Sequence, residues 1–257
     1  MSLFDLTGKT AVITGSTKGI GKAIAMRMAE HGANVVISSR KADACESVAA
    51  EIGRDWCRSG NVAVPIACNI QHKEQLQALA DGTLARFGRI DVLVCNAAVN
   101  PYFGPSKDIP DEAFDRVMQS NIRSNFWLCN MVLPDMVARK DGAIIIVSSI
   151  GGIQGRPLLG AYGISKAADM QMARNLACEY GPDNIRANCI APGLIRTDFA
   201  RALWENPDIL KKRVANNPLR RIGEPDEIAG AAVMLASAAG AYINGQTIVV
   251  DGGTVIA

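Results

Sequence analysis

The chain has 257 residues, of which 49% are apolar and 20% charged, and its formal net charge is +2. This profile is typical of a soluble globular protein, and no basic run or stripe indicates a nucleic-acid partner. Seven scattered cysteines and only two histidines, His31 and His72, argue against a metal site or a Ser-His-Asp triad. The sequence has no apolar signal core and no convincing membrane span, so we expect a cytoplasmic protein without a membrane partner.

Short β-branched runs alternate with longer helical stretches along the chain. Strands are predicted over 10–13, 34–37, 62–66, 92–94, 143–147, 187–190 and 247–250. Helices are predicted over about 20–31, 42–53, 72–87, 111–138, 161–180 and 226–238. Most of the strands are apolar at nearly every position, which is typical of strands covered on both faces. The pattern predicts one α/β domain over residues 1–257, a Rossmann-type doubly wound parallel sheet of about seven strands with helices on both faces.

Two long segments interrupt this alternation, residues 96–110 and 193–217. Both leave the carboxyl ends of predicted strands, where open α/β sheets bind ligands. Long excursions from a compact domain are usually functional. We therefore expect a ligand cleft between them, with residues 193–217 forming a lid over the substrate.

A glycine-rich turn joins the first strand to the first helix. Its residues after Thr14 are Gly15, Ser16, Thr17, Lys18, Gly19, Ile20 and Gly21. Glycines at this junction permit a tight turn and close approach of a pyrophosphate, and the helix N-terminus offers unpaired N–H groups. The turn predicts dinucleotide binding, and a purely structural glycine turn is the alternative.

The end of the second strand indicates which dinucleotide is bound. An acidic residue there would bind the ribose 2′-hydroxyl of NAD, but this chain has Ser39 followed by Arg40. A guanidinium suits a 2′-phosphate, and Lys18 could add a second cation. The sequence thus favours NADP(H), unless these cations are only solvated surface charges.

Tyr162 and Lys166 lie four residues apart at the start of a predicted helix and therefore share one of its faces. A tyrosine hydroxyl ordinarily titrates at about pH 10, and a nearby ammonium favours the phenolate needed for acid/base work near neutrality. Ser149 follows the fifth strand, where its hydroxyl could bind a substrate carbonyl. Asn121 lies within a predicted helix, where a buried amide would hold either a proton-relay water or structural partners.

The glycine-rich turn, Asn96, Asn121, Ser149, the Tyr162–Lys166 pair and Pro192–Gly193 follow one another along the chain. In this order they resemble the motifs of the short-chain dehydrogenase/reductase family, and the resemblance covers essentially the whole sequence. The resemblance makes Tyr162 the general acid in reduction, Lys166 the ligand of the ribose hydroxyls, Ser149 rather than Ser148 the group that orients the carbonyl, and Asn121 the organiser of a water relay. It also implies cofactor contacts from Asn69, Ile70, Asn96, Ala97, Ala98, Pro192, Gly193, Ile195 and Thr197. Two residues depart from the family pattern: Ala98 replaces a glycine and Asn69 an aspartate.

The substrate pocket is expected where the two long segments meet the residues after Ser149. Its predicted lining is mostly apolar or aromatic and favours a hydrophobic carbonyl compound, although these side chains could instead pack the lid onto the body: Tyr102, Phe103, Gln154, Leu158, Leu159, Leu203 and Trp204. The segments around Asn96 and Pro192 resemble a narrower group, the NADP-dependent carbonyl reductases related to peroxisomal retinal- and dicarbonyl-reducing enzymes.

Three other functions remain open from the sequence. A 3-oxoacyl thioester reductase would use basic residues near the pocket mouth, for which Arg156, Arg196, Arg201 and Lys211–Arg213 are candidates. An alcohol or sugar dehydrogenase working oxidatively is possible, as is a redox sensor that binds the dinucleotide without turnover. The resemblance also implies a homotetramer.

Overall fold

The computed structural model describes residues 2–257 and contains one parallel sheet of seven strands. The strand order is β3-β2-β1-β4-β5-β6-β7, with every neighbouring pair parallel. The strands are β1 Thr10–Thr14, β2 Asn34–Ser38, β3 Ala63–Pro65, β4 Val92–Cys95, β5 Gly142–Val147, β6 Ile185–Pro192 and β7 Thr247–Val250. The predicted α/β fold is confirmed, including the number of strands.

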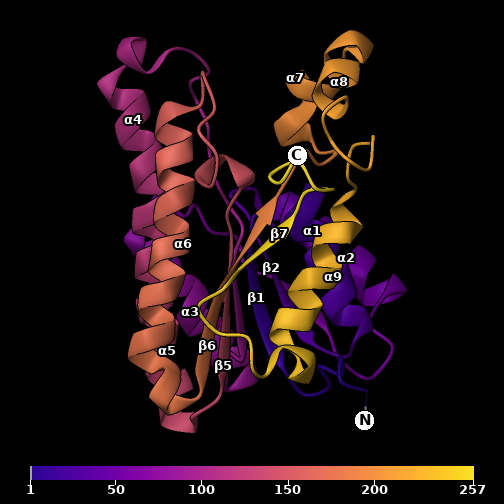
Figure 1. Ribbon diagram of the computed structural model, residues 1–257. Coiled ribbons are helices and arrows are strands. Elements are labelled where there is room, and N and C mark those ends of the chain that lie inside the picture. Colours follow the sequence, from indigo (N-terminus) through magenta and orange to yellow (C-terminus); the bar gives the residue numbers. More distant parts are fainter. Residues whose placement is uncertain (1) are drawn as a thin grey trace.

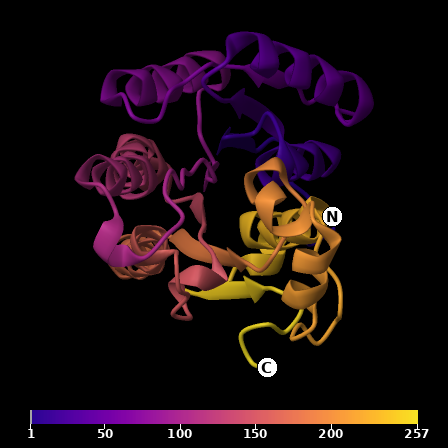
Figure 2. The same ribbon diagram turned by 90° about the horizontal axis from the view of Figure 1, so that it is seen from above.

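Helices cover both faces of the sheet (Figures 1 and 2). One face carries α1 Gly19–Glu30, α2 Ala42–Asp55 and α9 Pro225–Ala236; the other carries α3 Lys73–Phe87, α5 Ser124–Arg139 and α6 Gly160–Tyr180. Successive strand side chains point to opposite faces, so Val12 joins the α3–α5–α6 core and Ile13 the α1–α2–α9 core. The strands are apolar at successive positions because their side chains belong to both cores in turn.

The predicted helix over 111–138 is divided by a π-helical segment. It consists of α4 Asp111–Val117, six π-helical residues Met118–Arg123, and α5. Single π turns inside α-helices frequently mark functional sites. This one contains Asn121.

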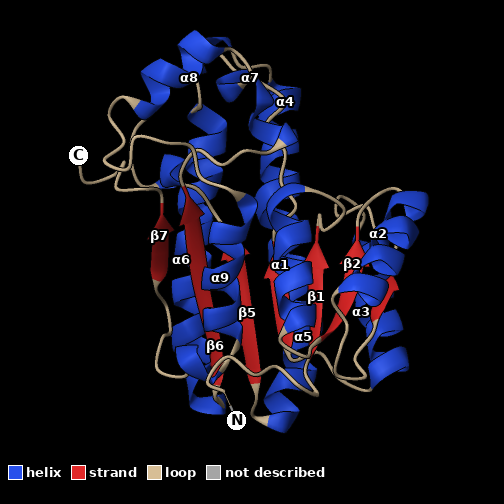
Figure 3. Ribbon diagram, turned by 90° about the vertical axis from the view of Figure 1, so that its right-hand side faces the viewer, coloured by secondary structure: helices blue, strands red, loops and turns tan. Residues whose placement is uncertain are grey.

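The carboxyl ends of the strands all point to one end of the molecule, where the two long segments lie. Within 193–217 the chain forms two short helices, α7 Arg201–Trp204 and α8 Pro207–Val214, which the sequence pattern did not predict. Figure 3 shows α4, α7 and α8 at the end of the molecule to which the strand arrows point, and Figure 1 shows α4 on the opposite side of that end from α7 and α8. This end of the sheet brings the predicted functional residues together.

Candidate active site

The glycine-rich turn leads directly into α1, whose first turn has no side-chain cap. Gly15 and Gly19 have φ values of 66° and 56°, the left-handed region that favours glycine. A Cβ on Gly15 would lie 3.0 Å from the Asn96 amide nitrogen, and one on Gly21 would collide with the Gly15 carbonyl oxygen. The turn therefore needs its glycines, and it leaves the N–H groups of the helix start without a side-chain acceptor.

Ser16, for which the sequence analysis predicted a cofactor contact, lies inside this turn. It is fully buried, and its hydroxyl donates to the Ile13 carbonyl at 2.7 Å and accepts the Ser38 N–H at 2.8 Å. Its own N–H donates to the Ser38 carbonyl at 3.1 Å. Ser16 thus fastens the turn to β2, which leaves none of these groups for a ligand.

Asn96 joins the end of β4 to the glycine turn. Its side-chain amide donates to the carbonyl oxygens of Thr14 and Gly15, at 2.9 and 3.1 Å. The Thr14 hydroxyl accepts the N–H groups of Asn96 and Ala97 at 3.0 and 3.1 Å. Asn96 is therefore a support of the turn, and its side-chain N–H groups are already used.

The segment after β6 reaches the same turn. The Thr197 methyl group would lie 3.2 Å from a Cβ on Gly19, so Thr197 sits beside the turn. Ile195 is buried in the α1–α2–α9 core, so only its backbone remains for a cofactor contact. A Cβ on Gly193 would come within 2.8 Å of the Asp251 Cα, so packing explains this glycine.

Ser39 and Arg40 follow β2, at the same end of the sheet. The Ser39 N–H donates to the Cys45 sulfur at 3.1 Å, and the two side chains approach to 3.3 Å. Arg40 is exposed and makes no ion pair or side-chain hydrogen bond within residues 2–257. Lys18, by contrast, is paired with Asp198 at 3.3 Å. Arg40 is thus an available cation beside the end of β2, next to the exposed Lys41.

Asn69 and Ile70 follow β3 and are both partly buried. The Asn69 side-chain oxygen accepts the Gln71 N–H at 3.3 Å, and its backbone N–H donates to Gln75 at 2.8 Å. Asn69 therefore shapes the turn that leads into α3.

Tyr162 and Ser149 face a common space above Gly151. A Cβ on Gly151 would lie 3.4 Å from the Ser149 hydroxyl oxygen and 4.0 Å from the Tyr162 ring. The Ser149 hydroxyl accepts the Gly151 N–H at 3.1 Å, whereas the Ser148 hydroxyl is buried and donates to the Lys166 carbonyl. Ser149, which the family resemblance implied as the group that orients the carbonyl, is thus the serine that shares this space with Tyr162.

Lys166 lies one helical turn after Tyr162 and is almost fully buried. Its ammonium nitrogen lies 5.8 Å from the centre of the Tyr162 ring. It donates to the Val147 carbonyl and to the Asp169 carboxylate, both at 2.9 Å. A buried charge requires such partners. The sequence analysis predicted Lys166 but missed Asp169.

Asn121 is fully buried and connects three segments. Its amide donates to the Val99 carbonyl and the Ser165 hydroxyl, both at 3.0 Å, and accepts the Val99 N–H at 2.9 Å. Both amide hydrogens are used, and one lone pair of the oxygen is left for a water. Asn121 therefore positions the 96–110 segment against α6, which favours the structural alternative for most of its hydrogen-bonding groups.

Phe199 was missed as a lining residue. Its ring centre lies 6.1 Å from that of Tyr162, and its side chain is 58% exposed. Phe199 belongs to residues 193–217, the predicted lid, and its ring lies near the Tyr162 ring on the side of that segment. The signal in the sequence was the apolar residue two positions after Thr197.

Several predicted pocket residues have other contacts. The Trp204 N–H donates to the Thr197 carbonyl at 2.9 Å, and its ring lies under Arg196. Trp204 also lines a surface hollow together with Gly19 and Met26 of α1. Gln154 donates to the Val255 carbonyl at 2.8 Å near the end of the chain.

The 96–110 segment contacts the residues after β5. The Gly104 N–H donates to the Leu158 carbonyl at 3.2 Å, while Tyr102 donates to the Pro105 carbonyl. Leu158 has a φ of 71° and is 39% exposed, and Phe103 is 54% exposed. Leu159 and Leu203 are partly buried.

Known proteins are similar to this chain in both sequence and fold. The family described as enoyl-(acyl carrier protein) reductase matches residues 15–255. Dehydrogenase/reductase SDR family member 4 of Bos taurus is 41% identical over 250 residues, which cover 97% of this chain and 88% of that protein. The chain is a member of the short-chain dehydrogenase/reductase family. The carbonyl-reductase resemblance noted from the sequence agrees with this relative.

Solved structures of the family superimpose over nearly the whole enzyme. A 7α-hydroxysteroid dehydrogenase complexed with NADH and 7-oxo-glycochenodeoxycholic acid gives a TM-score of 0.92 at 38% identity, covering 98% of this chain and 96% of that one. Gluconate 5-dehydrogenase from Burkholderia cenocepacia, in complex with NADP and tartrate, gives 0.91 at 34%, covering 99% and 98%. This short-chain dehydrogenase/reductase is accordingly an oxidoreductase that interconverts a carbonyl and an alcohol with a nicotinamide dinucleotide.

The glycine turn of this dehydrogenase/reductase fits a dinucleotide. A pyrophosphate requires close backbone approach and free N–H donors, and both are present at the start of α1, where side chains would fill the space. Residues 2–257 contain no helix long and apolar enough to cross a membrane. In the same residues no group of three or more His, Cys, Asp or Glu side chains could hold a metal ion.

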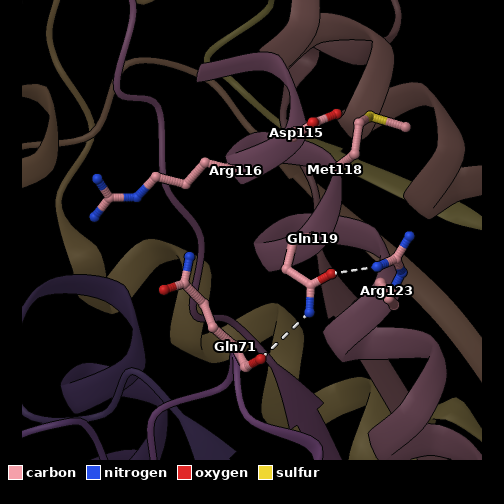
Figure 4. Close-up of a pocket in the computed structure, with 6 residues that line it drawn as sticks. All are labelled: Gln71, Asp115, Arg116, Met118, Gln119 and Arg123. Atoms are coloured by element: carbon pink, nitrogen blue, oxygen red, sulfur yellow. Dashed lines mark hydrogen bonds between the residues drawn. The ribbon is translucent and has the colours of Figure 1, made fainter. Parts of the chain in front are cut away.

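One surface hollow of the enzyme lies outside the predicted site. It is lined by Gln71, Asp115, Arg116, Met118, Gln119 and Arg123. Figure 4 shows Gln119 at its centre, donating to the Gln71 carbonyl and accepting from Arg123. The hollow joins the turn after β3 to the π-helical segment, and no sequence motif predicts it.

Proposed function

We propose that the enzyme is an NADPH-dependent carbonyl reductase for hydrophobic ketones or aldehydes. The observation that carries the proposal is the shared space above Gly151, which the Ser149 hydroxyl and the Tyr162 ring both face. When bound, the dinucleotide supplies the hydride. The chain itself must then bind the carbonyl oxygen and deliver one proton to it.

Each of the two hydroxyl groups has a distinct part in this reaction. Ser149 donates a hydrogen bond to the substrate carbonyl oxygen and so orients it. Tyr162 makes no side-chain hydrogen bond within the described chain, so its hydroxyl is free to donate its proton to the same oxygen. Lys166 keeps a positive charge near the phenol, which favours the phenolate left by that transfer.

The lining supports a hydrophobic substrate. The Phe199 ring lies near Tyr162, tilted by 38°, and the exposed side chains of Phe103 and Leu158 lie on the two segments that meet at the Gly104–Leu158 hydrogen bond. Apolar walls with a few polar groups are the usual composition of small-molecule pockets. We propose that residues 193–217, which carry Phe199, act as the lid of a single catalytic domain.

The preference for NADPH rests on the end of β2. Positions 39 and 40 carry a serine and an arginine, so no carboxylate at these two positions would repel a 2′-phosphate. The Arg40 guanidinium is unpaired in the described chain. Similar structures contain NADH in one case and NADP in another, so the preference must come from this chain's own residues.

The alternatives have less support. A thioester reductase would need a basic surface for an acidic carrier, but Arg196 is paired with Glu224 and Arg201 with Asp198. A sensor that binds the dinucleotide without turnover would not need Tyr162, Ser149 and Lys166 to lie close together. We also propose a homotetramer in the cytoplasm, on the family resemblance.

The test is a panel of aryl ketones, aldehydes, alcohols and one acyl thioester, assayed with NADPH and NADH in parallel. We expect ketone or aldehyde reduction with NADPH to dominate. Tyr162→Phe should lower kcat by about 10²–10⁴-fold, the usual contribution of a positioned acid. Tyr242→Phe, which alters a fully exposed tyrosine, should leave kcat unchanged. Unchanged turnover in Tyr162→Phe would refute the assignment, and preferred activity on the thioester would refute the substrate class.

A further inference from the structure

A buried carboxylate lies directly behind the proposed acid/base pair. Asp169 is fully buried on α6, three residues after Lys166, which is itself only 2% exposed. The Asp169 carboxylate and the Lys166 ammonium are 2.9 Å apart. None of the roles assigned so far uses Asp169, although burying an ion pair costs free energy.

Asn125 of α5 holds the carboxylate in place. Its amide donates to the second Asp169 oxygen at 3.1 Å and to the Asn121 carbonyl at 2.7 Å. Asn121 in turn donates to Ser165 of α6 at 3.0 Å. The carboxylate is therefore part of a buried network that spans the π-helical segment, α5 and α6.

Burial and charge act on Lys166 in opposite directions. Burial lowers the pKa of Lys166, but the charges of Asp169 and Tyr162 and the hydrogen bond to Asp169 outweigh it, so the pKa lies above its ordinary value. Burial raises the pKa of Asp169, and Lys166 and Asn125 oppose part of that rise. Without a counter-charge, a lysine this deeply buried would be expected to lose its proton.

The other titratable groups facing the pair are thiols. The Cys189 sulfur of β6 donates to the Asp169 carbonyl at 3.3 Å, and burial, followed by Asp169, raises the pKa of Cys189. The hydrogen bond with Cys129 of α5, together with burial, raises the pKa of Cys95 on β4. These raised pKa values keep the Cys189 and Cys95 thiols neutral near neutrality, so within residues 2–257 Asp169 and the Tyr162 phenolate supply the negative charges that face Lys166.

We propose that Asp169 is a positioning residue of this site: it keeps the Lys166 ammonium protonated and seated on the Val147 carbonyl, with Asn125 as its support. Two of the three ammonium hydrogens are thereby used, and one is left for another acceptor. The inference rests on the proposed function, because Lys166 matters only if Tyr162 performs the acid/base step.

The test is the pH profile of kcat/KM for alcohol oxidation in Asp169→Asn. The neutral amide keeps the shape but removes the counter-charge, so Lys166 becomes neutral and the phenolate loses its cationic neighbour. We expect the midpoint of the profile to move to higher pH by about one unit, which is about a tenfold loss near neutrality. At the high-pH plateau, where the phenol is ionised in both enzymes, the loss should shrink to less than about threefold.

Asp91→Asn is the matched control. Asp91 is 2% exposed and paired with Arg139 at 3.2 Å, but it precedes β4 at the opposite end of the sheet. This variant should lose stability and keep the midpoint of the wild-type enzyme. An unchanged midpoint in Asp169→Asn, a downward shift, or an equal loss at every pH would overturn the inference.

Two further measurements keep the outcome unambiguous. If Asp169→Asn does not fold, urea unfolding of Lys166→Met, Asp169→Leu and the double variant replaces it. Apolar replacement of a whole buried pair is far better tolerated than loss of one partner, so the double variant should unfold at more urea than either single one. Additive losses would refute the pair. Full turnover in Tyr162→Phe would instead refute the proposed function, whatever Asp169 does.

Discussion

At the scale of single residues, the site depends on polar groups whose partners are already chosen. The Ser148 hydroxyl donates to the backbone carbonyl of Lys166. The Ser149 hydroxyl only accepts a hydrogen bond, so its own hydrogen is left for a ligand. Asn96 and Ser16 are used by the glycine turn itself. The Tyr162 hydroxyl has no hydrogen-bond partner within residues 2–257 and is therefore also free for chemistry.

The cofactor preference is a prediction at this scale. Ser39→Asp places a carboxylate at the end of β2, where it would repel a 2′-phosphate and accept a ribose hydroxyl. We expect kcat/KM with NADPH to fall by about 100-fold and the preference to turn towards NADH. Arg40→Ala should lower kcat/KM with NADPH by roughly tenfold to a hundredfold, which corresponds to the loss of a charged hydrogen bond, and should leave kcat/KM with NADH unchanged. Lys41→Ala, an exposed neighbour, is the control; equal losses with both cofactors would contradict the role of Arg40.

At the scale of elements, the start of α9 anchors the base of the proposed lid. Glu224 and Glu227 form a capping box at this helix start. Glu224 also pairs with Arg196 at 2.9 Å, and Arg221 donates to Glu227 at 2.7 Å. The bridge between Ile195 and Gly223 joins the same two segments. The helix start therefore fixes where residues 193–217 leave the body.

Glu227 gives a prediction with a defined pH dependence. The hydrogen bond from Arg221, followed by the backbone N–H of Glu224, lowers the pKa of Glu227 from 4.5 to about 2. A lowered folded-state pKa stabilises the fold above the unfolded value, and this contribution is lost as the pH falls through the folded value. Glu227→Gln keeps a capping group but loses the charge, so it should lower the free energy of unfolding at pH 7 by roughly 0.5–1 kcal/mol, as for an exposed ion pair.

Urea unfolding at several pH values checks this. The difference between Glu227→Gln and the wild-type protein should begin to shrink below the unfolded value of 4.5 and approach zero near the folded value of about 2. A difference that stays constant with pH would mean that the charge of Glu227 contributes nothing.

At the scale of the whole molecule, large apolar side chains are exposed on the helices of one face. Phe114 of α4, Phe126 of α5 and Ile164 of α6 are 37%, 55% and 55% exposed. The edge strand β7 also exposes Val249, at 40%. Both features suit the proposed homotetramer, because exposed apolar patches and strand edges are typical of interfaces.

Light scattering tests the assembly. The wild-type protein should have four times the mass of one chain, and Phe126→Asp should give a smaller species, since a carboxylate in an apolar interface is costly. Leu3→Asp, at a side chain that is 64% exposed near the N-terminus, should keep the wild-type mass. A wild-type mass equal to one chain would remove the proposal.

The sequence by itself determined the sheet, most of the helices and the family. Its continuous apolar strands could only belong to a sheet covered on both faces, and the spacings from Gly15 to Gly21 and from Tyr162 to Lys166 are local, so they survive in a linear reading. The one helix over 111–138 was also correct in extent, apart from its π-helical segment.

Only the tertiary structure decided which polar groups are already used and which side chains meet. Ser16 is buried inside the glycine turn, Trp204 lines a hollow together with α1, and the Phe199 ring lies near Tyr162, although none of this is visible in local spacing. Asp169 has no motif to mark it, and its importance arises from burial beside Lys166 and from Asn125 on another helix. Contacts between distant segments depend on how the helices pack against the sheet, and a pattern along one chain carries no information about that packing.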